Sequence, residues 1–204
     1  SNKDTGQNPQ EKINKVKNIL LKNKADYLLV TAPENVAWIL NIRGYDSEFS
    51  PIPNARLLIN SKGNVDLFSQ SKKFIKIKKK FSKKIKFHHE DKIEKKLRNL
   101  WKNNIWLDSL SCSVHFKSLL AKNNRIIQKI DPIYFFKSIK NPTEIKNMKK
   151  SHMVDGVALT KFLFWLKKNF RKKKITEISA QKKLENFRKM NRAYKFPSFN
   201  TISG

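Results

Sequence analysis

The chain has 204 residues, of which 39% are apolar and four are Trp, so it has enough apolar mass for a folded core and is not a disordered tail. Its 45 Lys and Arg residues outnumber 16 Asp and Glu residues. The resulting net charge of +29 would attract phosphate polymers or anionic lipid, although a solvated Lys-rich surface is the simpler interpretation.

The first half of the chain predicts a mixture of short helices and strands. Residues 1–9 are polar and are expected to form a linker, and residues 10–23 carry apolar side chains at the spacing of an amphipathic helix. The apolar run at residues 26–31 predicts a buried strand. Residues 33–40 predict a short helix, and the Gly and Pro residues within 43–53 predict a loop.

An alternation of elements follows. Residues 55–59 and 65–68 predict two strands joined by a hairpin turn at 61–64, where Gly and Asn can adopt a positive φ. Beyond them the pattern predicts helices at 70–80, 91–100 and 112–123, each followed by a strand, at 84–87, 104–107 and 125–130. This order is typical of a three-layer α/β domain with a mixed or parallel sheet.

A second domain is expected to begin near residues 138–142. Asn141-Pro142-Thr143-Glu144 has the pattern of a helix start with a capping box, and the helix should run to about residue 168. Its apolar residues are too widely distributed for one face, which predicts burial on more than one side. A further helix is predicted at 176–191 and a strand at 196–203.

The most conspicuous candidate metal ligands are consecutive, at His88-His89-Glu90-Asp91. Neighbouring side chains on a strand point to opposite faces, so one ion would be difficult to coordinate with both histidines, and a solvated strand-to-helix corner is the favoured interpretation.

His115 and His152 each lack a second metal-ligating residue four positions away, which favours helix packing or surface exposure over metal binding. Cys112 is the only cysteine in the sequence, which excludes an internal disulfide and fits a reducing compartment. To act as a nucleophile it would need a positioned base, so the favoured interpretation of Cys112 is a small buried side chain.

The run Lys72–Lys86 interleaves lysines with Phe and Ile, a mixture that single-stranded nucleic acid can stack on. The simpler interpretation places the apolar side chains in the core and the lysines in solvent, so nucleic acid is not the expected partner. The alternative function, a Lys-rich α/β module that contacts nucleic acid or an acidic partner, depends on this run. With five glycines and no phosphate-cradling motif, a nucleotide loop is not expected.

Three stretches, in order and at matching spacing, resemble the Xaa-Pro aminopeptidases, which share the pita-bread catalytic fold with creatinase and methionine aminopeptidase. They are Ala25–Asp46 (ADYLLVTAPENVAWILNIRGYD), Lys137–Leu159 (KSIKNPTEIKNMKKSHMVDGVAL) and Phe196–Gly204 (FPSFNTISG). The resemblance implies a creatinase-type, ribonuclease H-like α/β domain at 10–138. It also implies the first portion of an α+β pita-bread catalytic domain at 139–204.

The same resemblance implies a function for the parent protein. The family hydrolyses the N-terminal residue from peptides with proline in second position, using two divalent ions, Mn²⁺ or Zn²⁺, held by two Asp, one His and two Glu. In the family these ligands lie beyond the position of Gly204, so we assign no catalytic, metal-binding or cofactor-binding residue to this chain. We expect a truncated fragment that holds no metal and is inactive alone.

The resemblance also suggests a cytoplasmic parent that forms a homodimer. Arg43 and Asp46 lie in a matched loop, where domain or subunit contacts are a more plausible role than catalysis. Asp155 lies in the first helix of the catalytic domain and not at a ligand position. A remnant that pairs with an intact peptidase subunit is a third interpretation. No apolar run approaches the roughly 18 residues that a membrane span requires, so we expect no membrane partner. The first residues contain neither a start Met nor an apolar stretch, so we expect no signal peptide.

Overall fold

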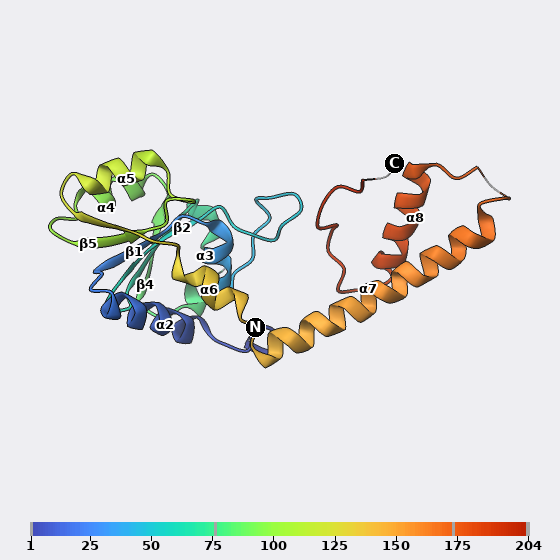
Figure 1. Ribbon diagram of the computed structural model, residues 1–204, viewed down its shortest axis with the longest axis horizontal. Coiled ribbons are helices and arrows are strands. Elements are labelled where there is room, and N and C mark those ends of the chain that lie inside the picture. The colour runs from blue at the N-terminus through green and yellow to red at the C-terminus, as the bar shows by residue number, and fades with distance from the viewer. Residues whose placement is uncertain (1, 76, 173, 203–204) are drawn as a thin grey trace. The chain divides into compact units, whose positions relative to one another are not determined.

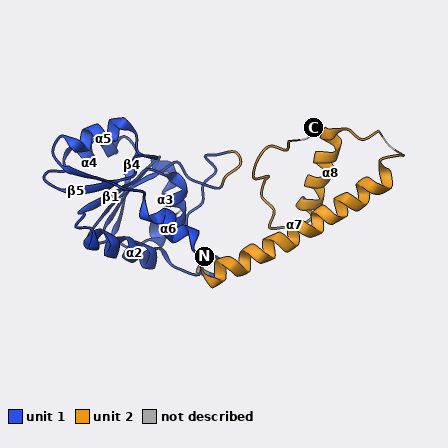
Figure 2. Cartoon of the chain, in the orientation of Figure 1, with its two compact units in different colours: residues 1–47, 51–140 blue, residues 48–50, 141–204 orange. Residues whose placement is uncertain are grey.

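The computed structural model describes residues 2–75, 77–172 and 174–202. The chain divides into two compact units, the first formed by residues 1–47 and 51–140 and the second by 48–50 and 141–204 (Figure 2). Each unit is considered by itself below. No described helix combines the length and the apolar character that are needed to cross a bilayer.

The first unit alternates helices and strands (Figure 1). Its elements are α1 (Asn2–Thr5), α2 (Pro9–Lys22), β1 (Tyr27–Val30), α3 (Pro33–Leu40), β2 (Arg56–Asn60), β3 (Val65–Ser69), β4 (Ile85–His89), α4 (Lys92–Arg98), β5 (Asn104–Leu107), α5 (Val114–Ala121), β6 (Arg125–Gln128) and α6 (Pro132–Ser138). All six predicted strands of this unit are present, and the turn between β2 and β3 contains Gly63 at a φ of 82°. Part of the range predicted as a linker forms α1 instead.

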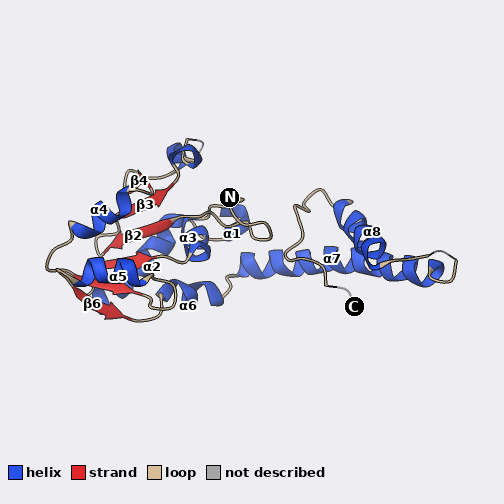
Figure 3. Cartoon of the chain, turned by 90° about the horizontal axis from the view of Figure 1, so that it is seen from above, coloured by secondary structure: helices blue, strands red, loops and turns tan. Residues whose placement is uncertain are grey.

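The six strands form one mixed sheet in the order β4-β3-β2-β1-β5-β6 (Figure 3). Strand β2 runs antiparallel to both β1 and β3, and the other neighbouring pairs are parallel. Side chains alternate along each strand, so Leu28 and Val30 join one core cluster and Leu29 joins the other. Helices α2, α3 and α6 contribute to the first cluster, and α4 and α5 contribute to the second. The predicted three-layer α/β architecture is confirmed.

The end of α3 is fixed by a lysine from α2. The side chain of Lys12 is buried, and its ammonium donates to the backbone oxygen of Trp38 at 2.9 Å and to the side-chain oxygen of Asn41 at 2.7 Å. Asn41 follows α3 in the left-handed conformation, with a φ of 52°. These bonds satisfy a buried charge and position the start of the loop at 43–53.

The prediction of a helix at 70–80 is wrong. The structure has two 3₁₀ turns there, η1 (Ser71–Lys73) and η2 (Lys78–Lys80). An α-helix would align lysines three and four residues apart on one face, which is destabilising. The turns instead let Phe74 and Phe81 both reach Phe87 of β4, with ring centroids 5.0 and 5.8 Å apart respectively.

The second unit contains a helical hairpin of α7 (Pro142–Asn169) and α8 (Glu177–Lys189). The predicted capping box of α7 is confirmed, since the Asn141 side chain accepts from the Glu144 amide at 3.0 Å and Glu144 accepts from the Asn141 amide at 2.9 Å. Between the helices, the Arg188 guanidinium donates two hydrogen bonds to the Asp155 carboxylate, at 2.7 and 3.1 Å.

Two predictions for this unit are wrong in the described structure. Burial of α7 on more than one side is not seen, because Ala158 is its only buried residue and Phe164 is 68% exposed. The predicted strand at 196–203 is absent from its described part, residues 196–202. A strand needs a neighbour to hydrogen-bond, and every described strand belongs to the sheet of the first unit.

Candidate functional site

The two neighbouring histidines of β4 contact different carboxylates. His88 Nε2 lies 2.6 Å from Asp66 Oδ1, while Lys96 Nζ lies 3.0 Å from the other oxygen of Asp66. His89 Nδ1 lies 3.0 Å from Asp91 Oδ2. Within the described part of the chain, no group of three or more His, Cys, Asp or Glu side chains could hold a metal ion. The described residues thus offer no ligand set for the two-metal centre that the resemblance implies.

The remaining histidines and the cysteine also have ordinary surroundings. His115 of α5 lies 2.8 Å from Glu94 of α4, and this contact lowers the pKa of the Glu94 carboxyl. His152 Nδ1 lies 2.9 Å from the backbone oxygen of Met148 within α7. Burial, with the nearby charge of Asp108, raises the pKa of the Cys112 thiol, which disfavours the nucleophilic thiolate.

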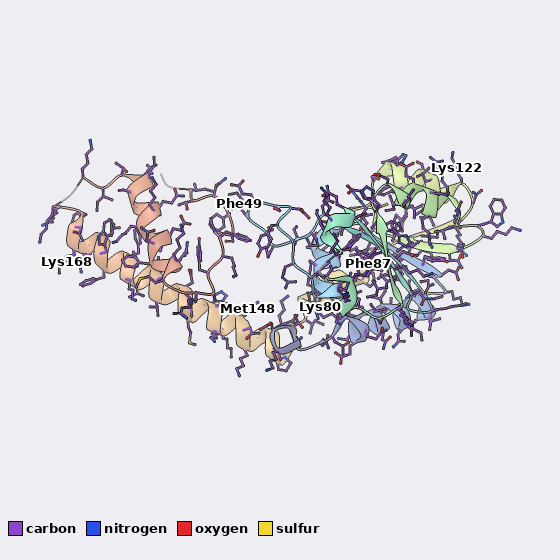
Figure 4. The ribbon with its side chains drawn as sticks, turned by 180° about the vertical axis from the view of Figure 1, so that it is seen from behind. Phe49, Lys80, Phe87, Lys122, Met148 and Lys168 are labelled. Carbon is purple, nitrogen blue, oxygen red and sulfur yellow. The ribbon has the colours of Figure 1, made fainter. Side chains whose placement is uncertain are left out.

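The aromatic residues of the run Lys72–Lys86 face inward. Phe74 is 7% exposed, and Phe81 packs against the same core cluster. Their rings are therefore engaged with Phe87 and are not presented to stack on bases. Lys80 of this run is exposed, and Figure 4 labels it together with Phe87.

A buried polar network that the sequence analysis did not identify joins α3 to α6. Asp131 caps the start of α6 by accepting from the Ile133 amide at 2.9 Å, and its other oxygen accepts from Asn35 Nδ2 at 2.9 Å. Lys137, one turn and a half further along the chain, donates to Asn35 Oδ1 at 2.9 Å. The Asp-Pro pair at 131–132 is a helix-start signal that could have revealed the cap, but the partner Asn35 lies 96 residues away.

A second buried carboxylate lies close enough to influence Asp131. Asp108 follows β5 and accepts from the Leu110 amide at 2.9 Å through Oδ1, while its Oδ2 has no hydrogen-bond partner among the described residues. Burial raises the pKa of Asp131 to about 6, and the charge of Asp108 adds to the rise. This network positions α6 against the sheet domain; the described cavities do not reach it.

The matched loop at 43–53 borders the larger described cavity, of about 710 Å³. Asp46 accepts from the Asn54 amide at 2.7 Å and pairs with Lys73 Nζ at 2.7 Å. The hydrogen bond from Lys73 is the main cause that lowers the pKa of Asp46. Arg43 and Asp46, for which domain or subunit contacts are expected, both line this cavity.

Comparisons of the sequence with known proteins agree with the fold. The family profile of the creatinase/prolidase N-terminal domain matches residues 1–144. Xaa-Pro aminopeptidase 1 of Dictyostelium discoideum is 33% identical over 98% of this chain and 33% of its own length. Xaa-Pro aminopeptidase ApepP of Drosophila melanogaster is 34% identical over 92% of the chain and 32% of its own length. The chain thus spans about a third of the length of these curated relatives.

Solved structures show the same architecture. The X-prolyl aminopeptidase of Caenorhabditis elegans, described as a cytosolic enzyme with a di-nuclear active site, matches all of this chain and 34% of its own, with a TM-score of 0.88 and 24% identity. The Xaa-Pro dipeptidase from Bacillus anthracis matches 90% of this chain and 49% of its own, with a TM-score of 0.66 and 16% identity. The resemblance to the Xaa-Pro aminopeptidases is confirmed, and the chain belongs to the creatinase/prolidase N-terminal domain family.

Proposed function

We propose that this chain is part of a metal-dependent Xaa-Pro aminopeptidase, which hydrolyses the N-terminal residue from peptides with proline in second position. One observation carries the proposal: Xaa-Pro aminopeptidases from two organisms match at least 92% of the chain at 33% and 34% identity. In this proposal residues 10–138 are the middle domain and residues 139–204 begin the catalytic domain. The parent is cytoplasmic and forms a homodimer.

The proposal places the catalytic metal ions outside this chain. The di-nuclear site described for the Caenorhabditis elegans enzyme supports two metal ions in the parent. We propose that they are divalent, Mn²⁺ or Zn²⁺, as the family resemblance implies. The described residues of this chain offer no group that could hold even one of them. We therefore assign no step of the hydrolysis to these residues, and we expect the chain to be inactive alone.

The test compares two purified proteins: the 204-residue chain and the longest product of the same reading frame. Each is incubated with Mn²⁺ or with Zn²⁺ and a short peptide with proline in second position, and the matched control peptide has alanine there. Metal content after dialysis is measured by mass spectrometry. We expect the longer product alone to retain two metal ions and to release the first residue from the proline peptide. Equal hydrolysis by the 204-residue chain would overturn the inactive-fragment proposal, and no hydrolysis by either protein would overturn the proposed activity.

A further inference from the structure

We propose that the cavity beside the loop at 43–53 binds a small ligand that carries a carboxylate on an apolar body. The cavity lies entirely within the first unit and measures about 710 Å³. This volume is in the range of about 300–1,000 Å³ that is usual for small-molecule sites. The binding would be independent of the proposed peptidase activity, because no metal or catalytic group is needed for it.

The inner wall of the cavity is apolar and held in place. Leu40 at the end of α3 and Leu67 of β3 are buried side chains that line it. Phe74 and Phe81, which directly follow η1 and η2, complete the wall, and both pack against Phe87 of β4. Because these groups already pack against the core of the unit, the wall is formed before any ligand arrives.

The loop that closes the cavity is braced as well. The Gly44 amide donates to the backbone oxygen of Pro51 at 3.2 Å. A Cβ atom at Gly44 would lie 2.6 Å from the Cα of Pro53, so only glycine permits the backbone at residue 44 to approach Pro53 this closely. Asp46 ties the loop to Lys73 of η1 and to the Asn54 amide.

A positioned guanidinium supplies the anion-binding group. Nη1 of Arg43 donates to the backbone oxygen of Ile42 at 2.9 Å and is 3.4 Å from that of Ala37. These contacts orient the side chain at the end of α3. Among the described residues, these two contacts use only Nη1 of Arg43, so Nε and Nη2 can donate to a ligand. A guanidinium binds a carboxylate through two parallel hydrogen bonds, which matches this free edge.

The charges of the lining select an anion. Among the lining residues that the structure describes, Arg43, Lys73 and Lys80 contribute three cations, and Asp46 is the only carboxylate. Lys73 and the Asn54 amide already engage that carboxylate, so it offers little to an incoming cation. The net charge of +29 on the whole chain adds to the attraction. A compact phosphate would leave the apolar wall unfilled, whereas a carboxylate with an apolar body satisfies both parts of the cavity.

Two sources could supply this chemistry, a free apolar acid or the C-terminus of an apolar peptide. The probes are therefore phenylbutyrate, an acetylated Leu-Phe dipeptide with a free carboxylate, its amidated form, and the uncharged phenylbutanol. The readout is the amide resonance of Gly44 in the isotope-labelled 204-residue chain. Using a local resonance separates the cavity from the exposed apolar side chains of the second unit, such as Phe164.

We expect phenylbutyrate to shift the Gly44 resonance in a saturable manner. Arg43→Gln should weaken its binding about tenfold, the usual value of a charge-assisted hydrogen bond. Lys80→Gln, which removes an exposed lining charge, should weaken it less. The matched control is Lys122→Gln, a residue outside this cavity lining and well separated from Lys80 in Figure 4, which should leave the affinity unchanged. Lys80→Gln also tests the charge requirement without touching the loop, should Arg43→Gln disturb it.

Binding of the free-acid dipeptide but not of its amide would assign a peptide terminus as the ligand. Binding of phenylbutyrate but of neither dipeptide would assign a small free acid. Either result supports the proposal. Equal affinity for phenylbutanol and phenylbutyrate would overturn it, as would an unchanged Gly44 resonance at saturating acid or an equal loss of affinity in the Lys122→Gln control.

Discussion

Burial of Asp131 is expected to make this chain less stable as pH rises, which is opposite to the usual effect of a carboxylate. The side chain is 1% exposed, and burial raises its pKa from 3.8 to about 6 despite hydrogen bonds from Ile133 and Asn35. The folded state therefore holds this proton more tightly than the unfolded state does. Its contribution to the free energy of unfolding is fully present below about pH 4 and is lost as pH rises through about 6.

The size of the effect follows from the same values. A rise of about two pH units, at about 1.4 kcal/mol for each, corresponds to roughly 3 kcal/mol. Asp131→Asn removes the titrating proton but keeps a side-chain oxygen that can accept from the Ile133 amide. Relative to this variant, wild type should therefore lose roughly 2–3 kcal/mol of unfolding free energy between about pH 4 and neutral pH.

The assay is urea unfolding followed by Trp fluorescence across this pH range, on wild type, Asp131→Asn and the control variant Glu48→Gln. Glu48 is exposed, so its substitution should give a difference from wild type that does not vary with pH. A difference between wild type and Asp131→Asn that stays constant, or that shifts in favour of wild type as pH rises, would refute the burial cost assigned to Asp131.

Three further substitutions test contacts within the two units, one in the first and two in the second. Gly44→Ala would place a Cβ 2.6 Å from the Cα of Pro53 and should destabilise by about 1–3 kcal/mol. Gly156→Ala meets nothing within 4 Å inside α7 and should stabilise by about 0.5–1 kcal/mol; thermal unfolding that ranks the two variants the other way would contradict this account. Asp155→Asn should weaken the partly exposed pair with Arg188 by up to about 1 kcal/mol and speed amide exchange in α8, and unchanged exchange would argue against the pair.

Local signals in the sequence were sufficient for most of the sheet domain. Short runs rich in apolar residues predicted all six strands, because a strand that is buried on both faces carries consecutive apolar residues, as Leu28 and Leu29 show. The capping box at Asn141 and Glu144 predicted the start of α7, because its hydrogen bonds join residues three apart. The run at 70–80 failed for the converse reason, since the contacts of Phe74 with β4 are not local.

The sequence by itself determined the three-layer α/β architecture, the start of α7 and the family, because each depends on periodicity or on residues that are close in the chain. Only the tertiary structure decided what meets across the chain. It brought Asn35 to Asp131, and it assembled the cavity from segments as distant as Leu40 and Phe81. It also decided that the described part of the range 196–203 forms no strand, because a strand exists only where another backbone accepts its hydrogen bonds.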